Sequence, residues 1–183
     1  MPGLAYADSY VEARREGYRD GSGDTAGPEI ASDRLAAHIT RLNDQGGTMR
    51  FPSGEEAPKA PFAHLWMVAG GELIGRVGVR YALNPLPRRW GGQVGYEIRP
   101  AHRRQGFGHR TLALGVAHAR SYGVRNLLLT CDDDNAASAR IIERGGGVLE
   151  DRVVVAPGRL ARRYWIRLDI PTSPSVNAPA LPR

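Results

Sequence analysis

The stretch from Gly92 to Gly147 constrains the fold more than any other part of this 183-residue chain. Alternating polar and apolar residues at 93–99 predict a strand, and an amphipathic pattern at about 107–122 predicts a helix. The junction between them is the basic loop Arg103–Arg110, which contains two glycines. Glycines leave backbone N–H groups uncovered, and the start of a helix adds unpaired donors and the positive end of its dipole. The loop is therefore predicted to bind an anion.

The charges of the loop and the spacing of its glycines limit which anions it could bind. Arg103, Arg104, His109 and Arg110 crowd a helix start that favours acidic residues, so a polyanionic ligand is the simplest explanation. A dinucleotide-binding loop needs a third glycine at the position of Thr111, and a Walker loop needs Gly-Lys-Ser/Thr, which the chain lacks. The motif that remains is Arg-x-x-Gly-x-Gly between a strand and a helix.

The segment after the loop continues in a defined order. The apolar run 127–131 predicts a buried strand, and Asn135 opens a second helix that ends at Gly145–Gly147. With Gly-Tyr-Glu-Ile-Arg-Pro at 95–100, this resembles the central βαβα segment of the GNAT (Gcn5-related) N-acetyltransferases, whose pyrophosphate loop is Gln/Arg-x-x-Gly-x-Gly/Ala. The resemblance is close from Gly92 to Gly147 and looser on both sides. It looks like one poorly characterised subgroup of predicted acetyltransferases.

The resemblance implies an α/β (α+β) GNAT fold. Such a fold has a mixed, mostly antiparallel sheet of six to seven strands, about four flanking helices and a splayed parallel pair of central strands. Local patterns predict a helix around Tyr10, a second helix from Ser32, a loop at 46–61, a hairpin of two strands at 62–69 and 73–83, and last strands at 148–155 and 163–168. Little chain precedes the first helix, so the opening edge strand of the family is expected to be very short or missing.

Length and composition bound the organisation of the chain. They predict a single domain at 1–170, which the resemblance implies is a GNAT domain, and a disordered tail at 171–183. Cys131 is the only cysteine, and the chain lacks a secretory signal or an apolar run of membrane length, so we expect a cytoplasmic protein without membrane attachment. The net charge of +6 comes from arginines spread along the chain, which argues against nucleic acid as the main partner.

The resemblance implies acetyl-CoA as co-substrate and no metal. It assigns the pyrophosphate to the loop, and the pantetheine arm to the strand backbone around Ile98 and Arg99 and to Asn135. The residues expected to bind the cofactor are Ile98, Arg99, Arg103, Arg104, Gln105, Gly106, Phe107, Gly108, His109, Arg110 and Asn135. The three acids at 132–134 precede a helix, where acidic residues favour capping over metal ligation.

Glu97 is the candidate general base. The strand at 93–99 has a polar face of Gln93, Gly95, Glu97 and Arg99, and a central strand with a polar face is expected to border a wet cleft. Burial that raised the pKa of Glu97 toward neutrality would suit it to deprotonate an amine. The equal alternative is a structural ion pair with a neighbouring arginine such as Arg99 or Arg76.

The general acid is harder to assign. Many GNAT enzymes protonate the departing thiolate with a tyrosine in the helix after the asparagine, and by spacing that position holds Ile142 here. Ser138 and Tyr164 are the candidates to replace it. A covalent route through Cys131 is disfavoured, because the spacing shows no Cys-His pair and a cysteine that ends a buried strand is usually inert.

These expectations combine into an acetyl-CoA-dependent N-acetyltransferase that transfers the acetyl group directly to a primary amine. A non-catalytic CoA-binding regulator and a basic nucleic-acid-binding module are the alternatives. The acceptor stays open among small amines, peptides, aminoglycosides and polyamines, because the loops that choose it cannot be derived from the sequence. The oligomeric state stays open too, although homodimers are common among GNAT proteins.

Overall fold

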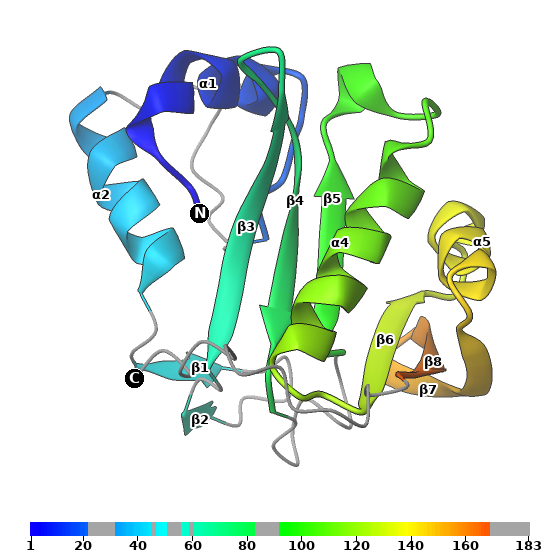
Figure 1. Cartoon of the computed structure of the whole chain (residues 1–183). Coiled ribbons are helices and arrows are strands. Elements are labelled where there is room, and N and C mark those ends of the chain that lie inside the picture. The colour runs from blue at the N-terminus through cyan, green and yellow to red at the C-terminus, as the bar shows by residue number, and fades with distance from the viewer. Residues whose placement is uncertain (22–31, 45–46, 51–55, 59–60, 83–91, 169–183) are drawn as a thin grey trace.

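The computed structural model describes residues 1–21, 32–44, 47–50, 56–58, 61–82 and 92–168 (Figure 1). A six-stranded sheet organises them, with the strands in the order β3-β4-β5-β6-β8-β7. The strands are β3 (Phe62–Ala69), β4 (Glu72–Arg80), β5 (Val94–Ile98), β6 (Asn126–Asp132), β7 (Val148–Ala156) and β8 (Arg159–Arg167). Only β5 and β6 are parallel neighbours; the other pairs are antiparallel. The predicted mixed sheet with a central parallel pair is confirmed.

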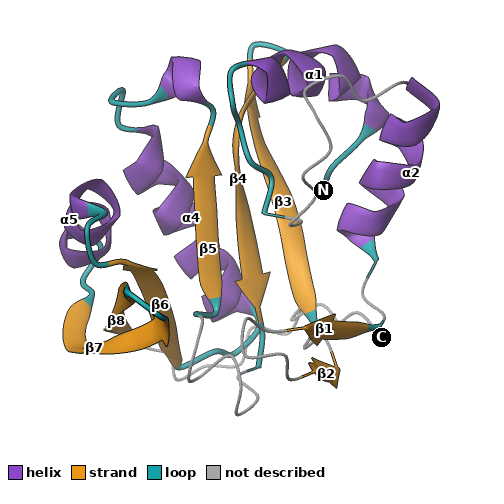
Figure 2. Ribbon diagram, turned by 180° about the vertical axis from the view of Figure 1, so that it is seen from behind, coloured by secondary structure: helices purple, strands orange, loops and turns teal. Residues whose placement is uncertain are grey.

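Four helices surround this sheet in the described part of the chain (Figure 2). They are α1 (Ala7–Arg15), α2 (Ser32–Asn43), α4 (Phe107–Ser121) and α5 (Ala136–Arg144), with short 3-10 turns η1 (Leu4–Tyr6) and η2 (Pro100–His102). An added Cβ at Gly115 of α4 would lie 2.7 Å from Val77 and 3.2 Å from Val94, so this glycine lets α4 pack closely on β4 and β5. None of these helices is long and apolar enough to span a bilayer.

The N-terminal side agrees with one prediction and differs from another. Residues 1–21 contain η1 and α1 but no strand, so the opening edge strand is missing from this part of the chain. The stretch 46–61, predicted to be a loop, includes the short antiparallel strands β1 (Thr48–Arg50) and β2 (Glu56–Pro58). Strands of three residues are too short to show a period, which is why the pattern missed them. The predicted tail at 171–183 lies outside the described residues.

A buried polar cluster joins α1 to α2. The Tyr10 hydroxyl donates to Asp20 at 2.5 Å, and His38 Nε2 lies 2.6 Å from the same carboxylate. All three side chains are almost completely buried, and Trp66 of β3 stacks on the Tyr10 ring. The predicted stripe of Leu35, Ile39 and Leu42 on α2 is likewise buried in this second core. The N-terminal helices are therefore fixed to the sheet by both apolar packing and a satisfied polar network.

A tight junction joins the first residues of β5 to β6. The Gln93 backbone N–H donates to Leu128 O at 2.6 Å, and its side-chain Oε1 accepts from Leu128 N at 3.1 Å. A Cβ at Gly92 would lie 2.7 Å from Leu128 O, so only glycine fits between the strands here. We call Gly92–Val94 with Leu128–Leu129 the strand junction. Gln93 was predicted to face a wet cleft, but it is buried and belongs to this junction instead.

Replacing Gln93 by alanine should lower the free energy of unfolding by about 1–3 kcal/mol, because it leaves the buried Leu128 N–H without an acceptor. Urea denaturation of Gln93→Ala and of the surface control Gln105→Ala measures this difference. Equal midpoints for the two variants would show that the side chain of Gln93 does not hold the strands together.

Candidate active site

β5 and β6 separate beyond the strand junction. They are paired at a single position, Val94 with Leu129, and the space that opens after it is a cleft of about 450 Å³. We call it the β5–β6 cleft; its lining includes Arg76, Tyr96, Glu97, Cys131, Asn135, Ser138 and Ile142. A larger hollow of about 1020 Å³ beside Trp165 and Arg167 contains none of the predicted site residues. The predicted site residues therefore gather at the smaller space.

The basic loop has the backbone geometry of an anion site. Gly106 caps α4 with φ +83°, no side chain caps the helix, and its first turn contains no acidic residue. Arg104 has φ +62°, the one positive value among the described residues other than glycine. A strained residue beside uncapped N–H donors is typical of a ligand-binding turn. The loop was correctly predicted to join a strand to a helix start.

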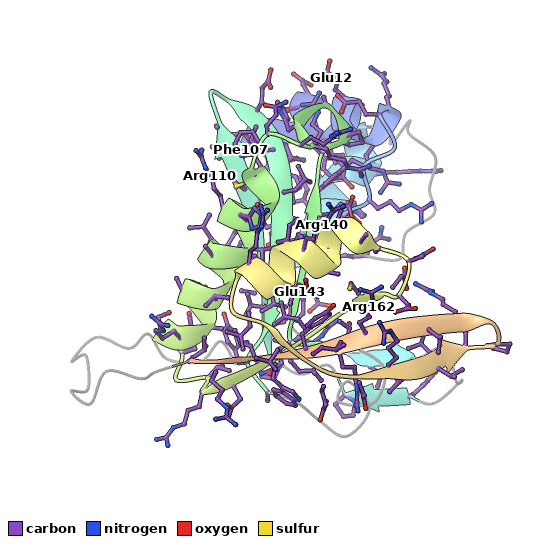
Figure 3. All side chains as sticks on the ribbon, turned by 90° about the vertical axis from the view of Figure 1, so that its right-hand side faces the viewer. Glu12, Phe107, Arg110, Arg140, Glu143 and Arg162 are labelled. Carbon is purple, nitrogen blue, oxygen red and sulfur yellow. The ribbon has the colours of Figure 1, made fainter. Side chains whose placement is uncertain are left out.

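The cations of the loop differ in their partners. Arg104 and Arg110 are exposed and form no ion pair with any described residue, while the Arg110 guanidinium lies 5.8 Å from the centre of the Phe107 ring. Figure 3 shows Phe107 and Arg110 together on the first turn of α4, with Arg140 on the neighbouring helix α5. Two unpaired guanidinium groups beside the uncapped helix start fit the phosphates of CoA.

Gly108 contributes to packing between two helices. A Cβ at this position would lie 2.6 Å from Cδ1 of Ile141, so the glycine lets α5 lie close against α4. A bulky residue here would move α5, and with it the residues that α5 brings to the cleft. Gly108 was expected to bind the cofactor, but its substitution would not test cofactor binding alone.

Asn135 opens α5 as predicted, and its Oδ1 accepts a hydrogen bond from Ser138 N at 3.0 Å. The preceding acids do not cap this helix. Asp132 pairs with Arg159 at 2.9 Å, and Asp133 pairs with both Arg152 and Arg162 at 2.7 Å. These arginines come from β7 and β8, so the acids tie the start of α5 to the last hairpin. The capping prediction was right for Asn135 and wrong for the aspartates.

Arg99 has a structural role. Its side chain is about 5% exposed and donates to Glu12 at 2.9 Å, to Glu16 at 2.6 Å and to Ser9 at 3.1 Å. The backbone N–H of Arg99 donates to Ile74 O, and its carbonyl accepts from His102. Strand pairing and η2 therefore occupy the backbone of Arg99, and its place on a wet face was predicted wrongly. Ile98 is closer to the predicted role, although Arg103 Nε donates to its carbonyl at 3.1 Å.

Glu97 lines the β5–β6 cleft as predicted. Its carboxylate accepts from Arg103 Nη2 at 2.7 Å, so its partner is neither Arg99 nor Arg76. The pair is open to solvent, with side chains about 33% and 52% exposed for Glu97 and Arg103. Because Arg103 also belongs to the basic loop, this one contact connects the expected phosphate site to the candidate base.

The two hydroxyl groups predicted as general acids differ in their position relative to the cleft. Ser138 lines the cleft, whereas Tyr164 is completely buried, donates to Glu143 at 3.1 Å and is not part of the cleft lining. Sequence reasoning missed Tyr96, whose hydroxyl donates to Ser138 Oγ at 3.4 Å inside the cleft. Burial raises the pKa of Tyr96, so the phenol stays protonated at neutral pH. Its place on the apolar face of β5 concealed it, since that face was expected to be core.

Cys131 also lines the cleft, but its thiol is poorly reactive. Burial is the main cause that raises the pKa of Cys131, and the nearby Arg162 offsets only part of this effect. A thiol that stays protonated at neutral pH is a weak nucleophile. This agrees with the preference for direct transfer over an acetyl-cysteine intermediate.

Comparisons with solved structures show the same fold. RimL, a ribosomal L7/L12 alpha-N-protein acetyltransferase in complex with coenzyme A, aligns with TM-score 0.59 and 16% identity over 92% of this chain and 90% of that one. The yncA protein of Salmonella typhimurium, a candidate acetyltransferase with its cofactor acetyl-CoA, aligns with TM-score 0.52 and 17% identity over 95% and 94%. A candidate acetyltransferase of Acinetobacter baylyi aligns with TM-score 0.56 and 17% identity over 93% of each chain.

Sequence comparison identifies the family. No curated protein matches the chain significantly. The family model described as "Acetyltransferase (GNAT) domain" matches residues 27–148, which is more than half of the chain. That range contains the basic loop, the strand junction and most of the cleft. The chain belongs to the GNAT family of acetyltransferases and is an acyltransferase of that family.

Proposed function

We propose that this protein transfers the acetyl group of acetyl-CoA directly to a primary amine. The observation that carries the proposal is the contact between Arg103 and Glu97, which joins an uncapped, basic helix start to a carboxylate in the β5–β6 cleft. With the phosphates of the cofactor bound at the loop, the cleft would be available to the pantetheine arm and the thioester. The family's RimL and yncA structures, which hold coenzyme A and acetyl-CoA, support this choice of co-substrate.

Acetyl-CoA supplies an activated acyl group as a thioester, and the residues of the cleft supply position and proton transfer. Glu97 accepts a proton from the incoming ammonium, so that the nitrogen lone pair can attack the carbonyl carbon. The new C–N bond forms as the C–S bond breaks. Tyr96, with Ser138 as its hydrogen-bond partner, donates a proton to the departing sulfur. Tyr164 is too deeply buried to serve this step directly.

Removing the free cations of the loop should weaken cofactor binding without unfolding the protein. Arg104→Ala and Arg110→Ala together should raise the Kd for acetyl-CoA by about tenfold to a hundredfold, since each exposed charge loses a phosphate partner. Calorimetric titration measures the Kd, and Arg120→Ala, an exposed arginine in the last turn of α4, is the matched control. Unchanged affinity in the double variant would mean that the loop is a structural turn.

Glu97→Gln should lower kcat/KM by about a hundredfold near pH 7, because the amine then arrives protonated and finds no base. Its rate should keep rising toward the pKa of the amine, about 10, whereas the wild-type rate levels off earlier. Thiol release between pH 6.5 and 9.5 measures both profiles, with the exposed Glu150→Gln as control. Parallel profiles would exclude Glu97 as the base and leave it as an ion-pair partner of Arg103.

Tyr96→Phe should lower kcat by about tenfold to a hundredfold while KM and the melting temperature change little, because only a hydroxyl is lost. The raised pKa of Tyr96 predicts no loss of wild-type activity through deprotonation of this phenol up to pH 9. The assay is thiol release from acetyl-CoA, and Tyr6→Phe is the control. A variant with wild-type kcat would show that the thiolate leaves without the help of Tyr96.

A further inference from the structure

Arg76 is an unpaired cation in the β5–β6 cleft. It lies on β4 and lines the cleft, yet it makes no hydrogen bond or ion pair with any described residue. Its Nε atom is buried and has no hydrogen-bond partner in the described part of the chain. An arginine donor without an acceptor is costly to keep inside a fold, so the site is complete only with a ligand.

The residue opposite Arg76 does not neutralise it. Arg76 and Glu97 face each other across β4 and β5, where directly opposite side chains start about 4.5–5.5 Å apart. The Glu97 carboxylate nevertheless bonds to Arg103. Further along the same face of β4, Arg80 has a pKa lowered first by burial and then by the positive charge of Arg76. Arg80 does not line the cleft, so Arg76 is the cation that lies beside the carboxylate of Glu97 in this space.

Two further buried groups around Arg76 lack partners. The Tyr18 hydroxyl and His64 Nε2 are buried without hydrogen bonds to any described residue, and Arg76 acts on the pKa of both groups. Burial is the main cause that lowers the pKa of His64 to about 4, so the imidazole is neutral at pH 7. Burial raises the pKa of Tyr18, so its phenol stays protonated. Tyr18 and His64 are thus neutral themselves. The negative charges that act on them are those of Asp20, which bonds to Tyr10 and His38, and, for Tyr18, of Glu97, which bonds to Arg103.

The strands leave room in front of this group. Gly78 of β4 pairs with Gly95 of β5 and with His64 of β3. A Cβ at Gly95 would meet nothing within 4 Å, and one at Gly78 would make only ordinary contacts at 3.7–3.9 Å. Glycine is not needed for a left-handed backbone at either position. Gly95 therefore leaves open space on the cleft side of β5, whereas the end of the Arg76 guanidinium packs against the backbone of Gly21.

We propose that Arg76 binds an oxyanion of the acceptor, and that the acceptor is a small α-amino acid whose carboxylate lies beside its primary amine. This inference rests on the proposed acetyl transfer to an amine. Glu97 receives the ammonium group and Arg76, directly opposite on the next strand, receives the carboxylate through its planar fork of donors. Polyamines and aminoglycosides carry only positive charge, and Arg76 repels them.

The test compares each amino acid with the amine that differs only by loss of the carboxylate, such as tyrosine with tyramine, lysine with cadaverine and arginine with agmatine. A full set of common amino acids and their decarboxylated partners is assayed by thiol release at saturating acetyl-CoA. We expect the best amino acid to exceed its partner in kcat/KM by about tenfold to a hundredfold, the range of a charged hydrogen-bonded contact.

The variant Arg76→Gln tests whether Arg76 causes the preference for the amino acid over its decarboxylated partner. It should abolish this preference by lowering kcat/KM for the amino acid about tenfold to a hundredfold, while the decarboxylated amine is unaffected or improved. Arg76→Lys should restore part of the preference, because it keeps the charge but not the fork. Arg167→Gln, an exposed arginine on β8 outside the cleft, is the control. The shift in melting temperature caused by acetyl-CoA should be the same in all variants.

The outcomes separate this inference from the proposed function. If acetyl-CoA binds and decarboxylated amines are acetylated as well as amino acids, the acyl transfer holds and the role of Arg76 is wrong. The role of Arg76 is equally wrong if Arg76→Gln lowers the rate of both partners by the same factor. If acetyl-CoA does not stabilise the wild-type protein and no amine releases thiol, the proposed function fails, and the inference fails with it.

Discussion

The separation of two parallel strands is the constraint on which the rest of this molecule depends. β5 and β6 are held together where Gln93 makes two hydrogen bonds to Leu128 and where Gly92 leaves no room for a side chain. One position later their pairing ends. Where β5 and β6 separate, their facing backbone groups no longer pair with each other. Other elements must therefore surround the gap, and these are α5 and the β7–β8 hairpin. The site exists because the strands are joined at one end only.

Some arginines around this opening stabilise the fold and others are available for binding. An arginine that is buried and paired with acidic residues belongs to the first group. Arg99 is almost completely buried and satisfied by Glu12, Glu16 and Ser9, so it fixes α1 to the end of β5. Arg103 bonds to Glu97 in a solvent-exposed pair that a stronger anion can displace, because exposed ion pairs contribute little. Arg76 has no partner in the described structure. Arginine therefore has three roles here: Arg99 holds α1 against the sheet, Arg103 connects the basic loop to the candidate base, and Arg76 is available to bind a ligand.

Local patterns were sufficient wherever neighbours in sequence decide the structure. The helix starts at Phe107 and Ala136, the Asn135 cap and the antiparallel hairpin of β3 and β4 follow from glycine placement, capping chemistry and alternation. The candidate base Glu97 was found in the same way, because it stands on the polar face of a central strand. The short strands β1 and β2 were missed, since three-residue strands are too brief to show a period.

By itself, the sequence determined the order of elements, the basic glycine loop and the family to which the chain belongs, because these depend on residue type and spacing along the chain. Only the tertiary structure decided which side chains meet. In the structure Glu97 bonds to Arg103, and Tyr96 bonds to Ser138. Tyr164 is buried away from the cleft, and Arg76 has no partner among the described residues. The physical reason is that a hydrogen bond or an ion pair depends on distances of a few ångströms between segments far apart in sequence, and no local pattern encodes those distances.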